Sequence, residues 1–166
     1  MYYRANKNNM ASILHRLPDA VAVMNGAPSN RQIYGTVKFY QARQGVLVVA
    51  DLHGLPVSVM PCQDGIFAFH IHSGAECSGS GADPFSNAGM HYNPNSCPHP
   101  YHAGDMPPLF CVGGQAFLSF LTDRFSVREI IGKAVILHDR PDDFTTQPSG
   151  NAGSKIACGI ISRVRR

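Results

Sequence analysis

The chain has 166 residues, which is typical of one domain, and a net charge of +3 with no dense Lys/Arg stripe of the kind that binds nucleic acid. Only 15% of the residues are charged, and the 16 Gly and 12 Pro favour strands and loops over coiled coils or long surface helices. No apolar run approaches the ~20 residues of a membrane-spanning helix, so we expect neither a membrane nor a nucleic acid as a partner.

We expect residues 1–30 to be a poorly ordered N-terminal extension and residues 31–166 to form the folded domain. The segment MYYRANKNNM is polar and lacks the apolar run of about 7–15 residues of a signal peptide, and NGAPSN at 25–30 is typical of a turn. The missing run favours a cytoplasmic protein. A signal peptide removed before this chain begins would instead favour an exported one, so both compartments stay open.

From residue 32 onward, apolar and polar residues alternate with period two, as in half-buried strands. The predicted strands are 33–40, 46–52, 66–72, 109–112, 115–121, 133–138 and 155–161. Residues 125–131 fit either a helical turn or an irregular connection. Short strands with turns between them and no helical alternation indicate an antiparallel barrel or sandwich.

Two predicted loops interrupt this pattern, at 73–107 and 139–154, and both are rich in Gly, Pro, Ser or Asn. Loops of this length inside a compact domain are usually functional.

Eight His and five Cys are the unusual feature of the composition. His70 and His72 lie two apart on a predicted strand, so their imidazoles leave the same face and could ligate one ion of copper or zinc. That pair alone is more typical of a solvated strand face, and His138, at the end of an apolar strand, is by itself more typical of a cap or core residue.

The first loop adds four further candidate ligands within fifteen residues. Three imidazoles and one carboxylate can close a tetrahedral zinc site. These candidates are His91, His99, His102 and Asp105. A single loop histidine is usually a surface side chain, but the concentration of these residue types favours metal binding.

Four motifs also occur in the order and approximate spacing of one protein family. They are FHIH at 69–72, HYNP at 91–94, HAGD at 102–105 and GNAGSKIACG at 150–159. From about residue 33 to 161 the chain therefore resembles the copper/zinc superoxide dismutases, of the bacterial type. The resemblance implies an eight-stranded Greek-key antiparallel β-barrel, an all-β, immunoglobulin-like sandwich, whose metals lie outside it between two long functional loops.

The resemblance also implies two ligand sets. Copper would be held by His70, His72, His91 and His138. Zinc would be held by His91, His99, His102 and Asp105. His91 would then bridge both ions with its two ring nitrogens, which no neutral tautomer can do, and would carry a proton during the reaction.

Metal-bound histidines need an acceptor for their other ring N–H. Asp142 matches the family's carboxylate that links His70 to His99. Asp143 is the neighbouring alternative, although an acid in this loop could equally be solvated.

The implied reaction is the conversion of superoxide anion to dioxygen and hydrogen peroxide by Cu(II)/Cu(I) cycling beside a structural zinc. A cation near copper should attract the substrate, and the family places an arginine there. This chain has Lys155, which keeps the charge but loses the planar guanidinium, so we expect weakened rather than abolished activity. By itself, Lys155 would be interpreted as an exposed strand-edge lysine. Ser149 matches a small hydroxyl residue of the family's channel.

The resemblance further implies a disulfide between Cys77 and Cys158 that pins the first loop to the barrel. Cys97 and Cys111 bracket the HAGD segment and could also pair. The odd count leaves at least one thiol, most simply a buried Cys62. A disulfide favours an oxidising compartment, in conflict with the missing signal peptide.

Two other functions compete with the enzyme. A copper-binding or copper-delivery module could keep this barrel with little turnover, but such proteins tend to lose ligands, and here all seven ligand positions are filled. A zinc-stabilised structural domain would require the strand histidines to be coincidental. Either a monomer or a homodimer is compatible with the sequence.

Overall fold

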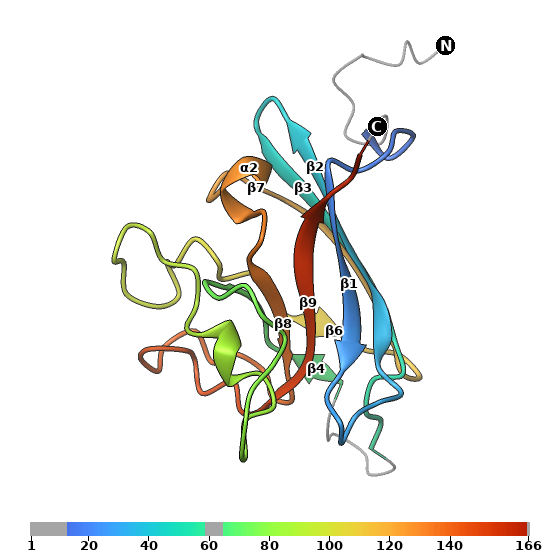
Figure 1. The fold of residues 1–166 in the computed structure, drawn as a ribbon, viewed down its shortest axis with the longest axis vertical. Helices are drawn as coiled ribbons and strands as arrows, with labels where there is room; N and C mark the ends of the chain where they lie inside the picture. Colours follow the sequence, from blue (N-terminus) through green and yellow to red (C-terminus); the bar gives the residue numbers. More distant parts are fainter. Residues whose placement is uncertain (1–12, 59–64, 166) are drawn as a thin grey trace, which may run out of the picture.

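The computed structural model describes residues 13–58 and 65–165, and their fold is a curled antiparallel sheet (Figure 1). The strands of the described residues are β1 (Ala20–Gly26), β2 (Tyr34–Ala42), β3 (Gly45–His53), β4 (Ile66–Phe67), β5 (Phe69–His72), β6 (Leu109–Phe110), β7 (Gln115–Thr122), β8 (Ala134–His138) and β9 (Lys155–Arg163). Seven of them form one sheet in the order β5-β8-β9-β1-β2-β3-β7, and β4 pairs with β6.

The small β4–β6 pair closes the sheet into a barrel. Only Ala68 separates β4 from β5, so these two are one interrupted strand at one edge of the large sheet. At the other edge, β6 leads into β7 through a bridge between Val112 and Gln115. Counted in this way, the described residues form the eight-stranded antiparallel barrel that the family resemblance implies.

Every predicted strand is present, with ends that differ by at most two residues. The undecided segment 125–131 contains a single helical turn, α2 (Val127–Ile130). It begins at a capping box, in which the Glu129 carboxylate accepts a hydrogen bond from the backbone N–H of Ser126 at 2.7 Å. None of the helices within residues 13–58 and 65–165 is long and apolar enough to cross a membrane.

The expected extension over residues 1–30 is wrong for its last part, because β1 is a central strand of the barrel. It pairs with β2 on one side and β9 on the other. Ala20, Ala22 and Met24 point into the core and are fully buried. Small alanines give a weak hydrophobic signal, and the strand is stabilised by pairing along both edges rather than by a strongly apolar sequence.

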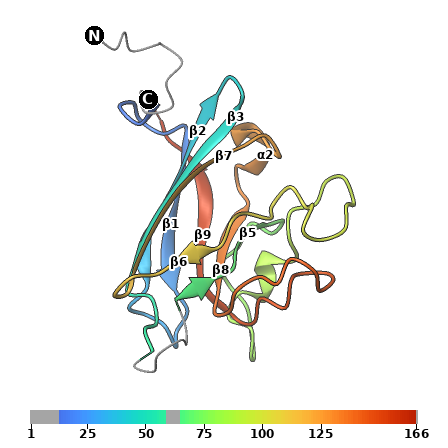
Figure 2. The ribbon, with the colours of Figure 1, turned by 180° about the vertical axis from the view of Figure 1, so that it is seen from behind.

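The two strands β5 and β8 are buried on both faces along their whole length. Their inner side chains, which include Phe69, Ile71 and Leu137, belong to the main hydrophobic core. Their outer side chains are covered by the two long loops, which lie on the same side of the barrel, outside β8 (Figures 1 and 2). This outer layer is where imidazoles are shielded from water.

The first long loop is held to the barrel by the predicted disulfide between Cys77 and Cys158 of β9, which is confirmed. Beneath it, Phe85 and Ala88, beside the short 3-10 helix η1 (Ser86–Ala88), pack on Ala134 in a second small apolar cluster. Closing a loop of 81 residues stabilises a fold by about 4.5 kcal/mol in the chain-entropy treatment.

The other cysteines do not form the alternative pair. Cys97 and Cys111 are both free thiols and partly buried. Cys62 lies outside the described residues.

Candidate metal centre

The site is built where the first loop lies along the outer face of β5. His70 and His72 leave this face of β5, and His138 lies at the end of β8, its neighbour in the sheet. Bridges join His72 to His91 and His70 to Asp105, so the loop continues the sheet as an irregular strand.

Gly104 permits this close approach of loop and strand. Its backbone carbonyl accepts a hydrogen bond from the N–H of Ile71 at 2.9 Å. A Cβ atom at residue 104 would lie 2.2 Å from the carbonyl oxygen of Ile71, a distance no side chain tolerates. The glycine of the HAGD motif therefore lets its aspartate reach the site.

Two groups of potential ligands result, and within each group the ligand atoms lie within 4.8 Å of one another. The strand group consists of His70, His72, His91 and His138. The loop group consists of His91, His99, His102 and Asp105. Both are buried, and they share His91. The structure thus brings together all seven residues that the sequence singled out as ligands.

In the strand group, each histidine of β5 and β8 has one ring nitrogen bonded outward and the other facing the group. His72 Nδ1 donates to the carbonyl oxygen of Gly89 at 2.7 Å, and His138 Nδ1 donates to that of Gly153 at 3.3 Å. His70 Nε2 donates to the carboxylate of Asp142 at 2.7 Å. These acceptors determine which ring nitrogen carries the proton and leave the other nitrogen free to bind a metal.

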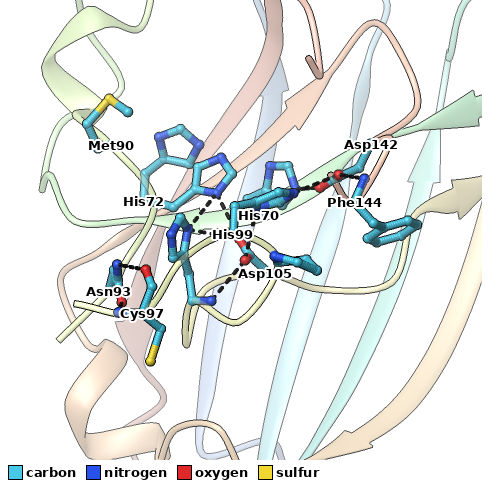
Figure 3. A network of polar contacts seen from close by, with 12 residues as sticks. His70, His72, Met90, Asn93, Cys97, His99, Asp105, Asp142 and Phe144 are labelled. Atoms are coloured by element: carbon cyan, nitrogen blue, oxygen red, sulfur yellow. Dashed lines mark hydrogen bonds and ion pairs between the residues drawn. The ribbon is translucent and has the colours of Figure 1, made fainter. Parts of the chain in front are cut away.

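The loop group is organised in the same way. His99 Nε2 donates to Asp142 at 2.8 Å, and the ring of His102 bonds the backbone of Cys97. Asp105 faces His91 Nδ1 at 2.7 Å and His99 Nδ1 at 3.1 Å. Figure 3 shows His99 and Asp105 gathered beside the β5 histidines.

The atoms left over fit two metal ions. The buried nitrogens His70 Nδ1, His91 Nε2 and His99 Nδ1 have no hydrogen-bond partner. His72 Nε2 and His138 Nε2, both left as lone pairs by their tautomers, face each other at 3.4 Å. A cation held between these two nitrogens would stabilise their convergence.

Asp142 ties the two groups together. Its two oxygens accept hydrogen bonds from His70 and His99, and one of them also accepts the backbone N–H of Phe144 at 2.7 Å (Figure 3). Gly150 makes room for it, because a Cβ there would lie 2.0 Å from the Asp142 carboxylate. Asp143, the alternative, instead bonds Thr145 and Thr146 within its own loop.

Burial and these contacts set the ionisation of the site. Burial lowers the pKa of His72 to about 2 and that of His138 to about 3, so both rings are neutral and able to bind metal. Burial raises the pKa of Asp142, but the hydrogen bonds from His70, Phe144 and His99 outweigh it and lower that pKa to about 2. Asp142 is therefore a carboxylate at neutral pH.

Lys155 is neither free nor fully exposed, contrary to its interpretation as an exposed strand-edge lysine. It is the first residue of β9 and the cross-strand partner of His138. Its Nζ donates to Asp83 Oδ2 at 2.6 Å and to the carbonyl oxygen of Phe85 at 3.2 Å. Ser149 lies half-buried in the second loop beside Gly150.

Three contributors to the site escaped the sequence analysis. Gln147 both donates to and accepts from the backbone of His99, at 2.7 and 3.0 Å. Arg124, which follows β7, donates through Nη1 to three backbone carbonyls of the first loop, two of them those of His102 and Asp105. Asp83 is the third, and no motif marks any of them.

Comparisons with known proteins agree with this geometry. A family model described as copper/zinc superoxide dismutase matches residues 33–161. A protein named superoxide dismutase [Cu-Zn] 2 of Aquifex aeolicus is 32% identical over 145 residues, 78% of this chain and 80% of its own. Similar proteins named superoxide dismutase [Cu-Zn] occur in Legionella pneumophila, 35% identical over 76% of each chain, and Photobacterium leiognathi, 31% identical over 76% of this chain and 78% of its own. The matched segment contains both ligand groups.

Proposed function

Because this chain belongs to the copper/zinc superoxide dismutase family, we propose that its strand group holds the copper and its loop group the zinc, with His91 a ligand of both. The protein is an oxidoreductase that converts superoxide to dioxygen and hydrogen peroxide, and its cofactors are copper and zinc. The observation that carries the assignment is the convergence of unpartnered histidine nitrogens, fixed by outward hydrogen bonds, in two adjoining groups.

When bound, copper supplies the one-electron chemistry that oxidises one superoxide to dioxygen and reduces a second, which takes two protons to become hydrogen peroxide. Zinc is redox-inert and suits the mixed imidazole–carboxylate loop group. The residues of the chain hold these ligands in place, exclude water and handle protons.

His91 is the residue we assign to proton handling. Its Nδ1 belongs to the loop group, whereas its Nε2 is buried without a hydrogen-bond partner and faces the strand group. A proton held at Nε2 has no acceptor except a molecule bound in the site. We therefore assign Nε2 of His91 as the atom that takes up one proton and delivers it to the reduced substrate.

Lys155 is the cation we assign to attract superoxide. Its strand partner is His138, whose pKa is lowered mainly by burial and then by His70, His91 and, least, the Lys155 ammonium. A positive charge near a small anion's binding site raises both its local concentration and its capture rate.

The test is the rate of superoxide decay after loading with one copper and one zinc per chain, for the wild type and a His138→Ala variant. Loss of a partner that only orients a ligand lowers metal affinity or activity 10–100-fold, so loss of a ligand should lower activity by more than about 100-fold. His15→Ala, which changes an exposed histidine outside both groups, is the matched control. Tight copper binding with decay no faster than in free solution would instead support a copper carrier.

We also propose that the protein is a homodimer that uses the hairpin of β6 and β7. Phe110, Val112 and Phe117 are 66%, 83% and 68% exposed. Extending the register of the Val112–Gln115 bridge places Phe110 opposite Phe117 on one face. Exposed apolar patches of this kind mark interaction surfaces. Sedimentation should show a dimer for the wild type and a monomer for Phe117→Lys, and a monomeric wild type would contradict the proposal.

A further inference from the structure

The substrate-attracting lysine has a carboxylate partner. Lys155 Nζ lies 2.6 Å from Asp83 Oδ2, an ion pair that joins β9 to the first long loop. The Lys155 side chain is only 14% exposed, whereas the Asp83 side chain is 43% exposed. The negative member of the pair is therefore the one that an approaching anion meets first.

The charges around the pair do not restore a positive field. Asp139 and Arg140, which follow His138 along the chain, are both exposed and carry opposite charges. Asp139 also accepts the backbone N–H of Ser154, so it lies beside the start of β9. Lys155 is balanced by Asp83, and Arg140 by Asp139, so the four side chains together carry no net charge.

We propose that Asp83 is the residue that limits anion capture in this enzyme, by neutralising the charge of Lys155. This inference rests on the proposed role of Lys155. Removing the negative charge should increase the attraction of superoxide, or of any small anion, to the strand group. The attraction should then depend more steeply on ionic strength, because exposed charges are screened by salt.

The geometry allows the charge of Asp83 to be separated from its shape. Besides the lysine, its Oδ1 accepts the backbone N–H of Phe85 at 3.0 Å. In Asp83→Asn the amide oxygen can still accept the backbone N–H of Phe85. Lys155 can still donate to the carbonyl oxygen of Phe85. Burial alone would raise the pKa of Asp83. The hydrogen bonds from Lys155 and the Phe85 N–H outweigh this effect, so the pKa lies below its ordinary value and the carboxylate is charged at neutral pH.

The experiment measures the dissociation constant of azide, a small anion that reports on attraction without turnover, by titrating the copper- and zinc-loaded protein spectroscopically at several ionic strengths. A unit charge at a separation of roughly 8 Å in water-like surroundings changes the binding of a monovalent anion about two- to threefold. Asp83→Asn should tighten azide binding by that factor at low salt and raise kcat/KM in parallel. The gain should vanish at about 1 M salt, where the Debye length is about 3 Å.

Two further variants make the result decisive. Asp51→Asn removes the same charge from β3, four strands from β8 in the sheet, and should leave azide binding as in the wild type. Lys155→Met should weaken azide binding. If Lys155→Met weakens it and Asp83→Asn does not tighten it, Asp83 only anchors the loop and the inference is overturned.

The remaining outcomes also decide. Unchanged azide binding in Lys155→Met would refute the role of the lysine itself, and with it the inference. A gain in Asp83→Asn that persists at high salt would show rearranged contacts rather than charge, and would also refute it. Should Asp83→Asn not fold, Asp83→Ser keeps a hydroxyl acceptor for Phe85 and serves as the second variant.

Discussion

The strand group and the loop group use the same chemistry but are supported differently. Three histidines of the strand group stand on β5 and β8, whose inner faces are part of the main core. The loop group stands entirely on the segment between β5 and β6, which has no strand of its own. Strands place ligands through the barrel, whereas a loop must be held by separate contacts.

Those contacts come from distant parts of the chain. The disulfide ties the loop to β9, Gln147 and Asp142 hold His99 from the second loop, and Arg124 holds the backbone near His102. We therefore expect the strand group to keep its metal affinity when one of these contacts is removed by mutation. The loop group should lose metal affinity first. Four predictions test this difference, from the largest effect to the smallest.

Acid should destabilise the metal-free protein strongly through the strand group. The folded-state pKa values of His72 and His138, about 2 and about 3, lie below the unfolded value of 6.5. Between these limits the unfolded chain binds more protons, so the free energy of unfolding decreases as the pH falls below about 6.5. Each histidine contributes about 1.4 kcal/mol per pH unit, or roughly 5 kcal/mol for both between pH 6.5 and 4.5.

Urea unfolding of the metal-free protein at a series of pH values measures this slope. His138→Gln, which keeps a polar side chain but does not titrate, should reduce the slope by about 1.4 kcal/mol per pH unit. A free energy of unfolding that stays constant from pH 6.5 to 4.5 would show that these rings become exposed without metal, and that the strands do not hold them in place.

Removing the disulfide should be the next largest effect, and it should separate the two groups. Cys77→Ser frees the loop, and the chain-entropy treatment predicts a loss of about 4.5 kcal/mol in the free energy of unfolding. Zinc affinity should fall more than copper affinity, because only the loop group depends wholly on the freed segment. Metal competition titrations measure both. Cys97→Ser, which changes a free thiol of the same loop, is the control.

The antiparallel strands and most of the candidate ligands could be predicted from the sequence because each signal is local, and the resemblance completed the ligand sets. Period-two alternation marks a strand without reference to its neighbours. The ligands fall in short motifs, apart from His99, which lies alone between two of them, and His138, which ends a strand. Strand β1 escaped because Ala20 and Ala22 contribute little hydrophobic signal and the strand is stabilised by two neighbours.

The contacts that position the ligands could not be predicted in the same way. Gly89 and Gly153 act through backbone carbonyls, which every residue type has. The Lys155–Asp83 pair spans 72 positions in the chain, and only the folded loop shows that the two side chains meet. Such pairs depend on tertiary geometry, so their residue types look like ordinary loop and surface residues.

Asp142→Asn should cut the link between the two groups. An amide offers one oxygen acceptor, so it cannot accept from both His70 and His99 as the carboxylate does. Loss of such a partner typically lowers metal affinity 10–100-fold, and we expect the larger loss for zinc. Asp143→Asn is the matched control, since Asp143 bonds only its own loop. Equal losses for the two metals would show that His70 needs Asp142 as much as His99 does.

Arg124→Met should have the smallest effect and the most selective one. The guanidinium Nη1 donates to the backbone carbonyls of Pro100, His102 and Asp105, at 2.9, 3.3 and 3.3 Å. Its loss leaves every ligand side chain in place but loosens the backbone that carries two of them. Zinc affinity should fall several-fold, up to about tenfold, because water can replace most of these hydrogen bonds and a net loss of about 1.4 kcal/mol is a factor of ten in an equilibrium constant.

Copper affinity should change much less in this variant, since three of the four strand-group ligands lie on β5 and β8, which Arg124 does not contact. Arg128→Met, which removes an exposed arginine of α2, controls for net charge. If copper affinity fell together with zinc affinity, the two groups would have to be a single mechanical unit coupled through His91. The contrast between strand-borne and loop-borne ligands would then describe their positions in the chain but not their stability.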